Sequence, residues 1–245
     1  MKVISLNIEG NKHYELVLPF LHTENPDVIC LQEVLEDDVN MFFSEFPEMI
    51  GTFKPFTYYG SKHERYASMS GKIFGNLVLA KNAYTTDSFY YWGSEINARI
   101  VDELELIHAT CRQNYSLVYV KVKADKNKDI VICTTHFPVT EEGESTPHQL
   151  EIIEPLSIKL KEFENFVLCG DFNAPRGGET FGLLTKMYKD NIPKKYMTSL
   201  DQNLHRVKGL QYMVDGCFSS GDVNVTSVKL CDGVSDHMAV VATLN

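Results

Sequence analysis

Polar residues that can bind a metal or move a proton adjoin several apolar runs of this sequence. In "FVLCGDFNAP" (166–175), four apolar residues lead directly into Gly170, Asp171 and Asn173. Gly, Asp and Asn are also ordinary turn residues, so this stretch alone is as typical of a turn as of a site. The residues found at comparable positions along the chain are Asn7, Glu33, His136, Asp171, Asn173, Asp215, Asp236 and His237.

Taken together, these residues indicate a cation site that acts on phosphate. Four of them are carboxylates, which would repel one another at the ends of apolar strands and would be costly to desolvate. A hard cation reverses that penalty, and Mg²⁺ prefers one or two carboxylates together with substrate phosphate and water. The histidines could hold or transfer a proton near neutral pH. Neither clustered cysteines nor a histidine-rich ligand set is present, which argues against structural zinc.

Strands must bring these residues to one edge of a sheet. Apolar runs of strand length, rich in Val, Ile and aromatic residues, recur from end to end. They span 3–6, 28–31, 73–80, 116–122, 130–135, 166–169, 212–218, 225–230 and 239–244. We expect strands to end at Glu33, His136 and Asp215, and the polar residues to meet where antiparallel neighbours enter at the same edge.

Apolar residues recur at helical spacing in residues 12–24, 35–46 and 149–163, which predicts helices there. We expect breaks or kinks in them at Pro19 and Pro155. Helices and strands interleave without a low-complexity linker. The pattern therefore predicts one α/β domain that spans residues 1–245.

Composition limits the classes of partner. The 245 residues carry a formal net charge of -10, which disfavours non-specific binding of nucleic acid over the whole surface. Two segments are nevertheless basic, 54–81 and 186–208, and the first contains Arg65, Tyr66 and two further tyrosines. Such runs are usually solvated surfaces, but basic residues interleaved with aromatics suit a phosphate-bearing polymer or a nucleotide.

The N-terminus resembles a strand rather than a signal peptide, and no apolar stretch approaches the roughly 20 residues of a membrane span. We therefore expect a cytoplasmic monomer without a membrane span. The six cysteines include no CxxC pair and lie mostly in or beside apolar runs, which predicts buried free thiols.

At these positions the sequence resembles the endonuclease/exonuclease/phosphatase superfamily, the DNase I-like, Mg²⁺-dependent phosphoesterases. The resemblance extends from Asn7 to His237 through "LNIEG", "LQE", "TTHF", "GDFN", "VDGCF" and "SDH", in that order. It implies a four-layer α/β sandwich, in which two mixed sheets pack face to face with helices outside. It also implies Mg²⁺ as the cofactor, with Mn²⁺ as a possible substitute.

The resemblance further implies roles for the residues near the metal. Glu33 would be the main Mg²⁺ ligand, Asn7 would hold the metal or the phosphate, and Asp236 would be a further metal ligand. Asp171 would orient or activate the attacking water, and Asn173 would hold the phosphate. Whether one metal or two act stays open.

On the phosphate side, the resemblance implies that His237 contacts the scissile phosphate as an acid, a base or a charge stabiliser. Asp215 would fix the orientation of its ring, and His136 would face the phosphate from the other side. Glu9 and Arg112 match an acidic position and a phosphate-contacting arginine of some relatives. Together with Arg65 and Tyr66 they are candidate substrate-binding residues.

One residue departs from the family pattern. Many members carry an aromatic residue after the aspartate of the "VDGCF" motif, where this chain has Gly216. The change leaves Asp215 in place and would either widen the pocket or move a loop.

Three functions fit these observations. The first choice is a phosphodiesterase acting on nucleic acid, of the endonuclease, exonuclease or DNA-repair type. The second is a phosphoesterase acting on a small sugar, inositol or nucleotide phosphate, which the net acidity favours. The third is a catalytically inactive binding module, which the intact set of site residues argues against.

Overall fold

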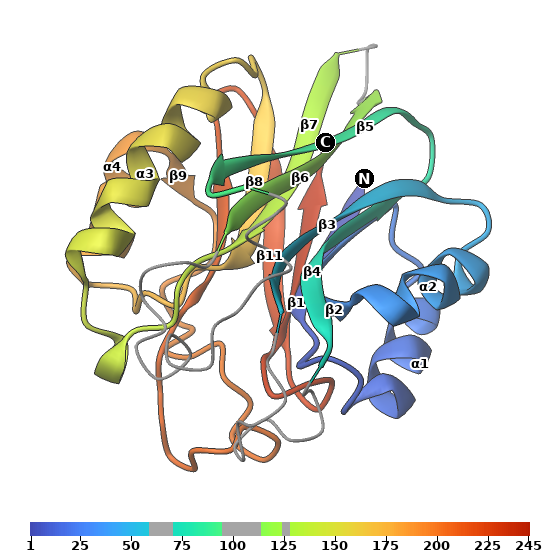
Figure 1. Ribbon diagram of the computed structural model, residues 1–245. Helices are drawn as coiled ribbons and strands as arrows, with labels where there is room; N and C mark the ends of the chain where they lie inside the picture. The colour runs from blue at the N-terminus through green and yellow to red at the C-terminus, as the bar shows by residue number, and fades with distance from the viewer. Residues whose placement is uncertain (59–70, 95–113, 124–127) are drawn as a thin grey trace.

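Two six-stranded sheets form the centre of the protein (Figure 1). The computed structural model describes residues 1–58, 71–94, 114–123 and 128–245. The first sheet has the order β11-β12-β1-β2-β4-β3 and contains β1 (Lys2–Asn7), β2 (Val28–Leu35), β3 (Ile50–Tyr58), β4 (Ile73–Ala80), β11 (Val225–Cys231) and β12 (Ala239–Leu244). The second has the order β5-β6-β7-β8-β10-β9 and contains β5 (Ala83–Trp92), β6 (Tyr115–Lys123), β7 (Asp129–His136), β8 (Phe166–Asp171), β9 (Lys189–Asp190) and β10 (Asp215–Ser219).

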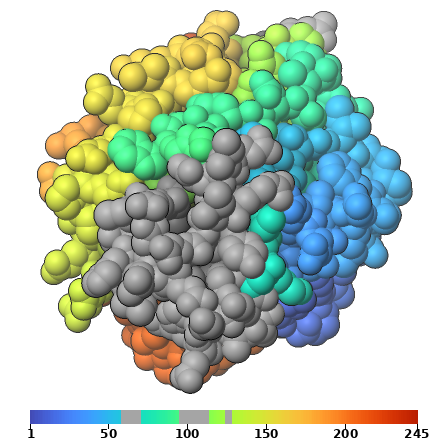
Figure 2. Space-filling model, viewed as in Figure 1, coloured from blue at the N-terminus to red at the C-terminus, as the bar shows by residue number. Residues whose placement is uncertain are grey.

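Helices cover the outer face of each sheet. The first sheet carries α1 (Tyr14–Glu24) and α2 (Val39–Glu45), and the second carries α3 (Pro147–Leu160) and α4 (Glu179–Met187). Two segments form single turns of 3₁₀ helix, η1 (Glu36–Asp38) and η5 (Glu141–Gly143). Figure 2 shows the two helix layers on opposite sides of the molecule, the N-terminal one in blue and α3 in yellow.

Alternation along the strands explains this layering. Val3 faces the core between the sheets, whereas its neighbour Ile4 faces α1 and α2. In the second sheet, Val167 faces inward while Leu168 packs against the layer of α3 and α4. Because the strands are buried on both faces, their sequences are continuous apolar runs. The predicted four-layer α/β sandwich is confirmed.

Several elements differ from the sequence-based expectation. Neither Pro19 nor Pro155 ends its helix, since α1 and α3 continue through them. Each proline removes one intrahelical hydrogen bond, and buried neighbours such as Val17 and Leu21 offset that loss. Strands β3 and β5 were not predicted, because their residues form no apolar run in the sequence. Each is an edge strand of its sheet and pairs with a neighbouring strand on one side.

Within the described residues, Cys30, Cys133, Cys169 and Cys217 are buried free thiols, and Cys231 is a partly exposed one. The prediction of free thiols is confirmed for these five, whereas Cys111 lies outside the described residues. No helix in the described part of the chain is both long and apolar enough to cross a bilayer.

Candidate active site

Two parallel strand pairs, one in each sheet, end at the same rim of the sandwich. In the first sheet Asn7 of β1 lies opposite Gln32 of β2, and in the second His136 of β7 lies opposite Asp171 of β8. Asp215 also lies opposite Asp171, but it begins β10 instead of ending a strand. The expectation of a strand that ends at Asp215 is therefore wrong. Because β10 runs antiparallel to β8, its first residue reaches the rim where β8 ends.

A β-bulge places Glu33 at this rim. The pairing of β2 with β4 shifts between Leu31 and Val34, and Glu33 adopts a left-handed conformation with φ 59°. Strand β2 then continues to Leu35, so the expected strand end at Glu33 is also wrong. Bulges of this kind re-aim a side chain without ending the strand. Here the bulge turns the carboxylate of Glu33 toward Asn7.

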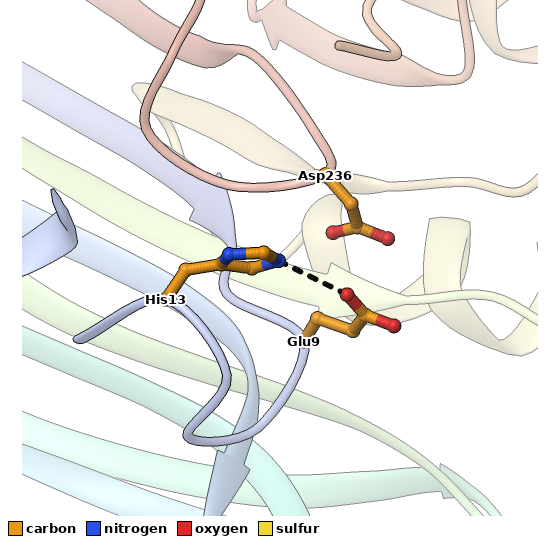
Figure 3. A group of neighbouring side chains, drawn as sticks. All are labelled: Glu9, His13 and Asp236. Carbon is orange, nitrogen blue, oxygen red and sulfur yellow. Dashed lines mark hydrogen bonds and ion pairs between the residues drawn. The ribbon is translucent and has the colours of Figure 1, made fainter. Parts of the chain in front are cut away.

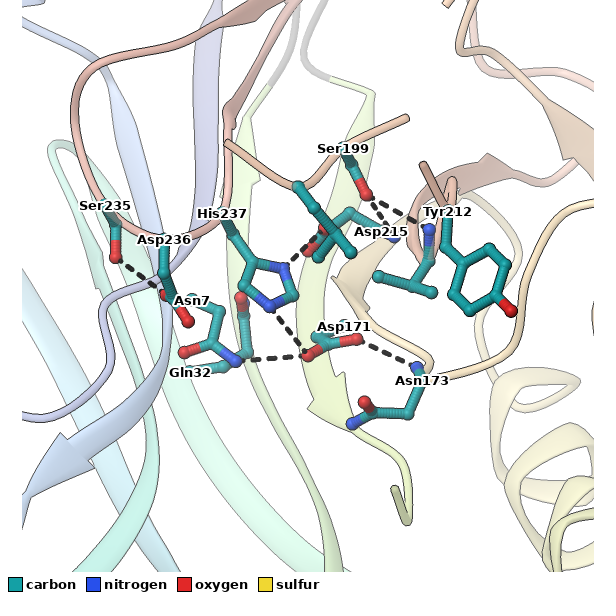
Figure 4. Close-up of polar contacts among 12 residues, drawn as sticks. Asn7, Gln32, Asp171, Asn173, Ser199, Tyr212, Asp215, Ser235, Asp236 and His237 are labelled. Atoms are coloured by element: carbon teal, nitrogen blue, oxygen red, sulfur yellow. Dashed lines mark hydrogen bonds and ion pairs between the residues drawn. The ribbon is translucent and has the colours of Figure 1, made fainter. Parts of the chain in front are cut away.

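The amide of Asn7 lies between two carboxylates from different sheets. Its Nδ2 donates to Glu33 Oε1 at 3.2 Å and to Asp171 Oδ2 at 3.1 Å, the second bond being drawn in Figure 4. Burial raises the pKa of Glu33, and although His136 opposes this, the charges of Asp236 and Asp171 add to it. Carboxylates crowded in this way bind a cation more readily than isolated ones, because the cation removes their repulsion.

His237 and Asp215 form a buried pair beside Asp171 (Figure 4). The Nδ1 of His237 lies 2.8 Å from Asp215 Oδ2, and its Nε2 lies 3.7 Å from Asp171 Oδ2. Burial alone would lower the pKa of His237, but Asp215 and Asp171 outweigh burial and raise it well above its usual value. The ring is thus oriented by one carboxylate and presents its other nitrogen to the rim, as in a histidine that holds a proton for phosphate.

Asp171 is the residue that most of the site contacts. Burial opposes its ionisation, but His237, His136 and the backbone N–H of Asn173 hold its pKa below the usual value. The Asn173 N–H donates to Asp171 Oδ1 at 2.8 Å, which closes an Asx turn, and Asn173 itself has φ 45°. "GDFN" therefore contains a turn and a part of the site at the same time.

His136 approaches the same carboxylate oxygen of Asp171 as His237 does. Its Nε2 is 3.4 Å from Asp171 Oδ2, 3.8 Å from Glu33 Oε1 and 2.9 Å from the side-chain nitrogen of Asn173. Burial lowers the pKa of His136, and the neighbouring carboxylates, Asp171 first, raise it overall. The carboxylate of Asp171 thus interacts with both histidines.

Asp236 belongs to a neighbouring group with Glu9 and His13 (Figure 3). The ligand atoms of these three side chains lie within 4.8 Å of one another, and His13 Nε2 is 3.1 Å from Glu9 Oε2. Glu9 also pairs with Lys12, and its backbone N–H donates to Asn7 Oδ1 at 3.1 Å. Asp171, Asp215 and His237 form the second such group within the described residues.

Residues 4–237 match the model of the Endonuclease/Exonuclease/phosphatase family, which is nearly the whole chain. The chain belongs to the endonuclease/exonuclease/phosphatase family. Enzymes of this family hydrolyse phosphoesters and depend on a divalent metal, and the two groups of carboxylates and histidines are compatible with metal binding.

Solved structures share the fold at low sequence identity. An endonuclease/exonuclease/phosphatase from Bacteroides vulgatus is 17% identical, with a TM-score of 0.72 over 100% of this chain and 98% of that chain. The catalytic domain of human Nocturnin with a bound sulfate anion is 16% identical, with a TM-score of 0.72 over 100% and 93%. A mannosyl-6-phosphatase from Bacteroides thetaiotaomicron is 12% identical, with a TM-score of 0.69 over 100% and 99%. No curated protein matches the chain in sequence.

Several supporting residues of this family member were not named as candidates from the sequence. Gln32 is fully buried between the sheets and donates to Thr134 Oγ1 at 2.7 Å and Ser5 Oγ at 3.1 Å, which links the two sheets just below the rim. The Oγ of Ser199 accepts from the backbone N–H of Asp215 at 3.0 Å. His13 follows Glu9 by four residues, and that spacing is the one clue that could have placed it.

Arg65, Tyr66 and Arg112, named from the sequence as candidate substrate-binding residues, lie outside the described residues. Glu9 lies beside Asp236, as given above, and all the other candidates meet at the rim.

Gly216 opens no pocket. A Cβ at this position would lie 2.6 Å from the ring of Phe172 and 2.5 Å from that of Phe218, whose centroids are 5.2 Å apart. These two rings fill the space above Gly216 on the helix side of the sheet. The rings of Phe172 and Phe218 leave no room here for a larger residue at position 216.

Proposed function

We propose that this protein is a divalent-metal-dependent phosphodiesterase that cleaves a nucleic-acid strand. The observation that carries the proposal is the arrangement around Asp171. Asn7 bridges Asp171 to Glu33, and His237, oriented by Asp215, brings its Nε2 to within 3.7 Å of the same Asp171 oxygen. Hydrolysis of a phosphoester depends mainly on such positioning and on electrostatic stabilisation of the phosphate oxygens.

The donors fit a hard cation. The carboxylate of Glu33 offers oxygen ligands, and burial, with the charges of Asp236 and Asp171 adding to it, raises its pKa, a cost that a cation would relieve. Asn7 has its Nδ2 toward Glu33 and its Oδ1 on the Glu9 N–H, so it would offer Oδ1 to a cation only with its amide turned over. We propose that Glu33 and Asn7 hold Mg²⁺ or Mn²⁺, with Asp236 as a further ligand. When bound, the cation supplies positive charge for the phosphate oxygens.

The remaining roles belong to the chain's own groups. Asp171, with its lowered pKa, stays ionised and accepts a hydrogen bond from the attacking water. His237 stays protonated near neutral pH because of Asp215, and its Nε2 donates to a phosphate oxygen or to the leaving group. Asn173 and His136 contact the opposite side of the phosphate.

A second candidate is a phosphomonoesterase that acts on a sugar phosphate. The net charge of -10 favours a small substrate over a long polyanion. The similarity to a mannosyl-6-phosphatase makes mannose 6-phosphate a natural member of the test set.

The test is a hydrolysis panel in Mg²⁺, Mn²⁺ or EDTA, with single- and double-stranded DNA, an abasic duplex, RNA, bis-p-nitrophenyl phosphate, p-nitrophenyl phosphate, an inositol phosphate and mannose 6-phosphate. We expect metal-dependent cleavage of a polymer, reduced about 10²- to 10³-fold in Glu33→Gln. Glu164→Gln, an exposed residue after α3, is the matched control and should retain full activity. Release of phosphate from the monoesters alone would select the second candidate.

A further inference from the structure

The loop of residues 199–209 runs alongside the segment that carries the candidate catalytic histidine. Leu200 forms an isolated antiparallel bridge with His237, and the Met238 N–H donates to the Ser199 carbonyl at 2.7 Å. The Asp201 N–H donates to the Asp236 carbonyl at 2.8 Å. The 199–209 loop is thus attached, through its backbone, to the part of the chain that positions His237.

Asp201 fixes the shape of the 199–209 loop. Its buried carboxylate accepts the backbone N–H groups of Asn203 at 2.7 Å, Leu204 at 2.8 Å and Gly233 at 2.6 Å. Although burial opposes this, the three N–H groups lower the pKa of Asp201 overall, so it remains an anion that holds them. The last of these bonds also joins the loop to the turn that precedes His237.

His205 places the exposed end of the loop against the site. Its ring is buried and meets the ring of His237 edge-on, with 6.4 Å between centroids. The Cα atoms of consecutive residues are about 3.8 Å apart. Arg206, which follows His205, therefore begins within one residue of a ring that touches His237.

The residues after His205 are exposed and basic. Arg206 and Lys208 are exposed, and Val207 between them is 47% exposed. Lys208 Nζ donates to the Asn203 carbonyl, which keeps its stem close to the loop. A protein of net charge -10 here presents two cations at the edge of a site for phosphate.

We propose that the 199–209 loop binds the phosphate adjacent to the scissile one in a nucleic-acid strand, through Arg206 and Lys208. This inference rests on the proposed phosphodiesterase function. A sugar monophosphate carries one phosphate, which His237 and its neighbours would engage, and so it leaves these two cations without a ligand. A polymer supplies the second phosphate, and the Asp201 anchor holds the loop backbone that carries the two cations beside the segment of His237.

The test compares the Arg206→Gln/Lys208→Gln double variant with the wild type. Binding of a short fluorescent oligonucleotide is measured by anisotropy across salt concentrations in a Glu33→Gln background, so that cleavage does not intervene. Because each phosphate contact on a single strand contributes about 0.7 to the slope of log K against log salt, the double variant should lower the slope by about 1.4. With cleavage-competent enzyme, KM for the oligonucleotide should rise roughly 3- to 30-fold while kcat stays within about 2-fold.

Two controls separate this proposal from the proposed function. Bis-p-nitrophenyl phosphate has no adjacent phosphate, so the double variant should hydrolyse it at the same rate as the wild type. Lys128→Gln/Lys161→Gln makes the same charge change at exposed residues outside both basic segments, one just before β7 and one just after α3, and should leave the slope unchanged. An unaltered slope in a protein that does cleave nucleic acid overturns the role of the loop and leaves the phosphodiesterase standing. If the wild type neither binds nor cleaves any oligonucleotide but hydrolyses small esters, both the nucleic-acid substrate and the loop's role are wrong.

Discussion

Replacing Gly170 with alanine should separate the two strands that carry His136 and Asp171. Gly170 has φ 147°, a region that side chains rarely adopt, and a Cβ there would lie 2.1 Å from the Thr135 carbonyl oxygen. Because the contact is with backbone of the paired strand β7, no side-chain rotation can relieve it. Either the strand pair opens or the backbone strains, directly below the rim.

The expected cost combines two terms. Overpacking costs about 1–3 kcal/mol, and a residue held in a sparsely populated backbone region costs about 1–3 kcal/mol. Their sum of about 2–6 kcal/mol corresponds to a melting temperature lowered by roughly 4–24 °C for a chain of this size. A displacement of about 1 Å between His136 and Asp171 would in addition lower kcat by about 10²-fold.

Thermal and urea unfolding, read together with hydrolysis of a small diester, measure both effects. Gly182→Ala is the matched control, because a Cβ at Gly182 in α4 meets nothing within 4 Å. That substitution should stabilise the protein by about 0.4–1 kcal/mol. If Gly170→Ala instead melted within about 1 °C of the wild type, β7 and β8 would not approach as closely as described, and the argument from close packing would fail.

Two further substitutions test the His237–Asp215 pair and the packing around Gly216. Asp215→Asn removes the carboxylate that raises the pKa of His237, so the alkaline limb of the pH–rate profile should move toward acid. Activity at neutral pH should fall about 10²- to 10⁴-fold, whereas the exposed Asp222→Asn should leave both unchanged. Gly216→Ala should cost about 1–3 kcal/mol in urea unfolding, because its Cβ meets the rings of Phe218 and Phe172. Adding Phe172→Leu should relieve the part of that overlap that Phe172 makes, so a double variant whose loss equals the sum of the single losses would contradict the packing described.

The sequence predicts best where one strand supplies both a buried run and its polar end. Asn7, His136 and Asp171 satisfy this condition, because the parallel pairs β1/β2 and β7/β8 reach the rim together. Asp215 does not, since the apolar residues before it, including Met213, are buried in a non-strand segment. Hydrophobicity reports burial in both cases, and it carries no information about which buried residues pair with a strand.

Other parts of the site depend on contacts between distant segments. Ser199 and Asp201 act on the backbone of Asp215 and Gly233, and a hydroxyl or carboxylate in a polar loop has no periodic pattern that could reveal its partner. The bulge at Glu33 likewise follows from the pairing of β2 with β4. Helix α4 was not predicted for a different reason, since it is short and has few buried residues.

The order of the first sheet has a consequence for synthesis on the ribosome. Strand β1 pairs on one side with β2 and on the other with β12, which follows every other strand in the chain. One edge of β1 therefore stays without its partner until β12 has been translated, and an apolar strand with an open edge is a template for aggregation. His237 is translated just before β12, so the nascent chain acquires its last candidate catalytic residue and closes this edge at nearly the same moment. A chain truncated before β12 would therefore leave this edge of β1 open, and one truncated before residue 237 would also lack the candidate catalytic histidine.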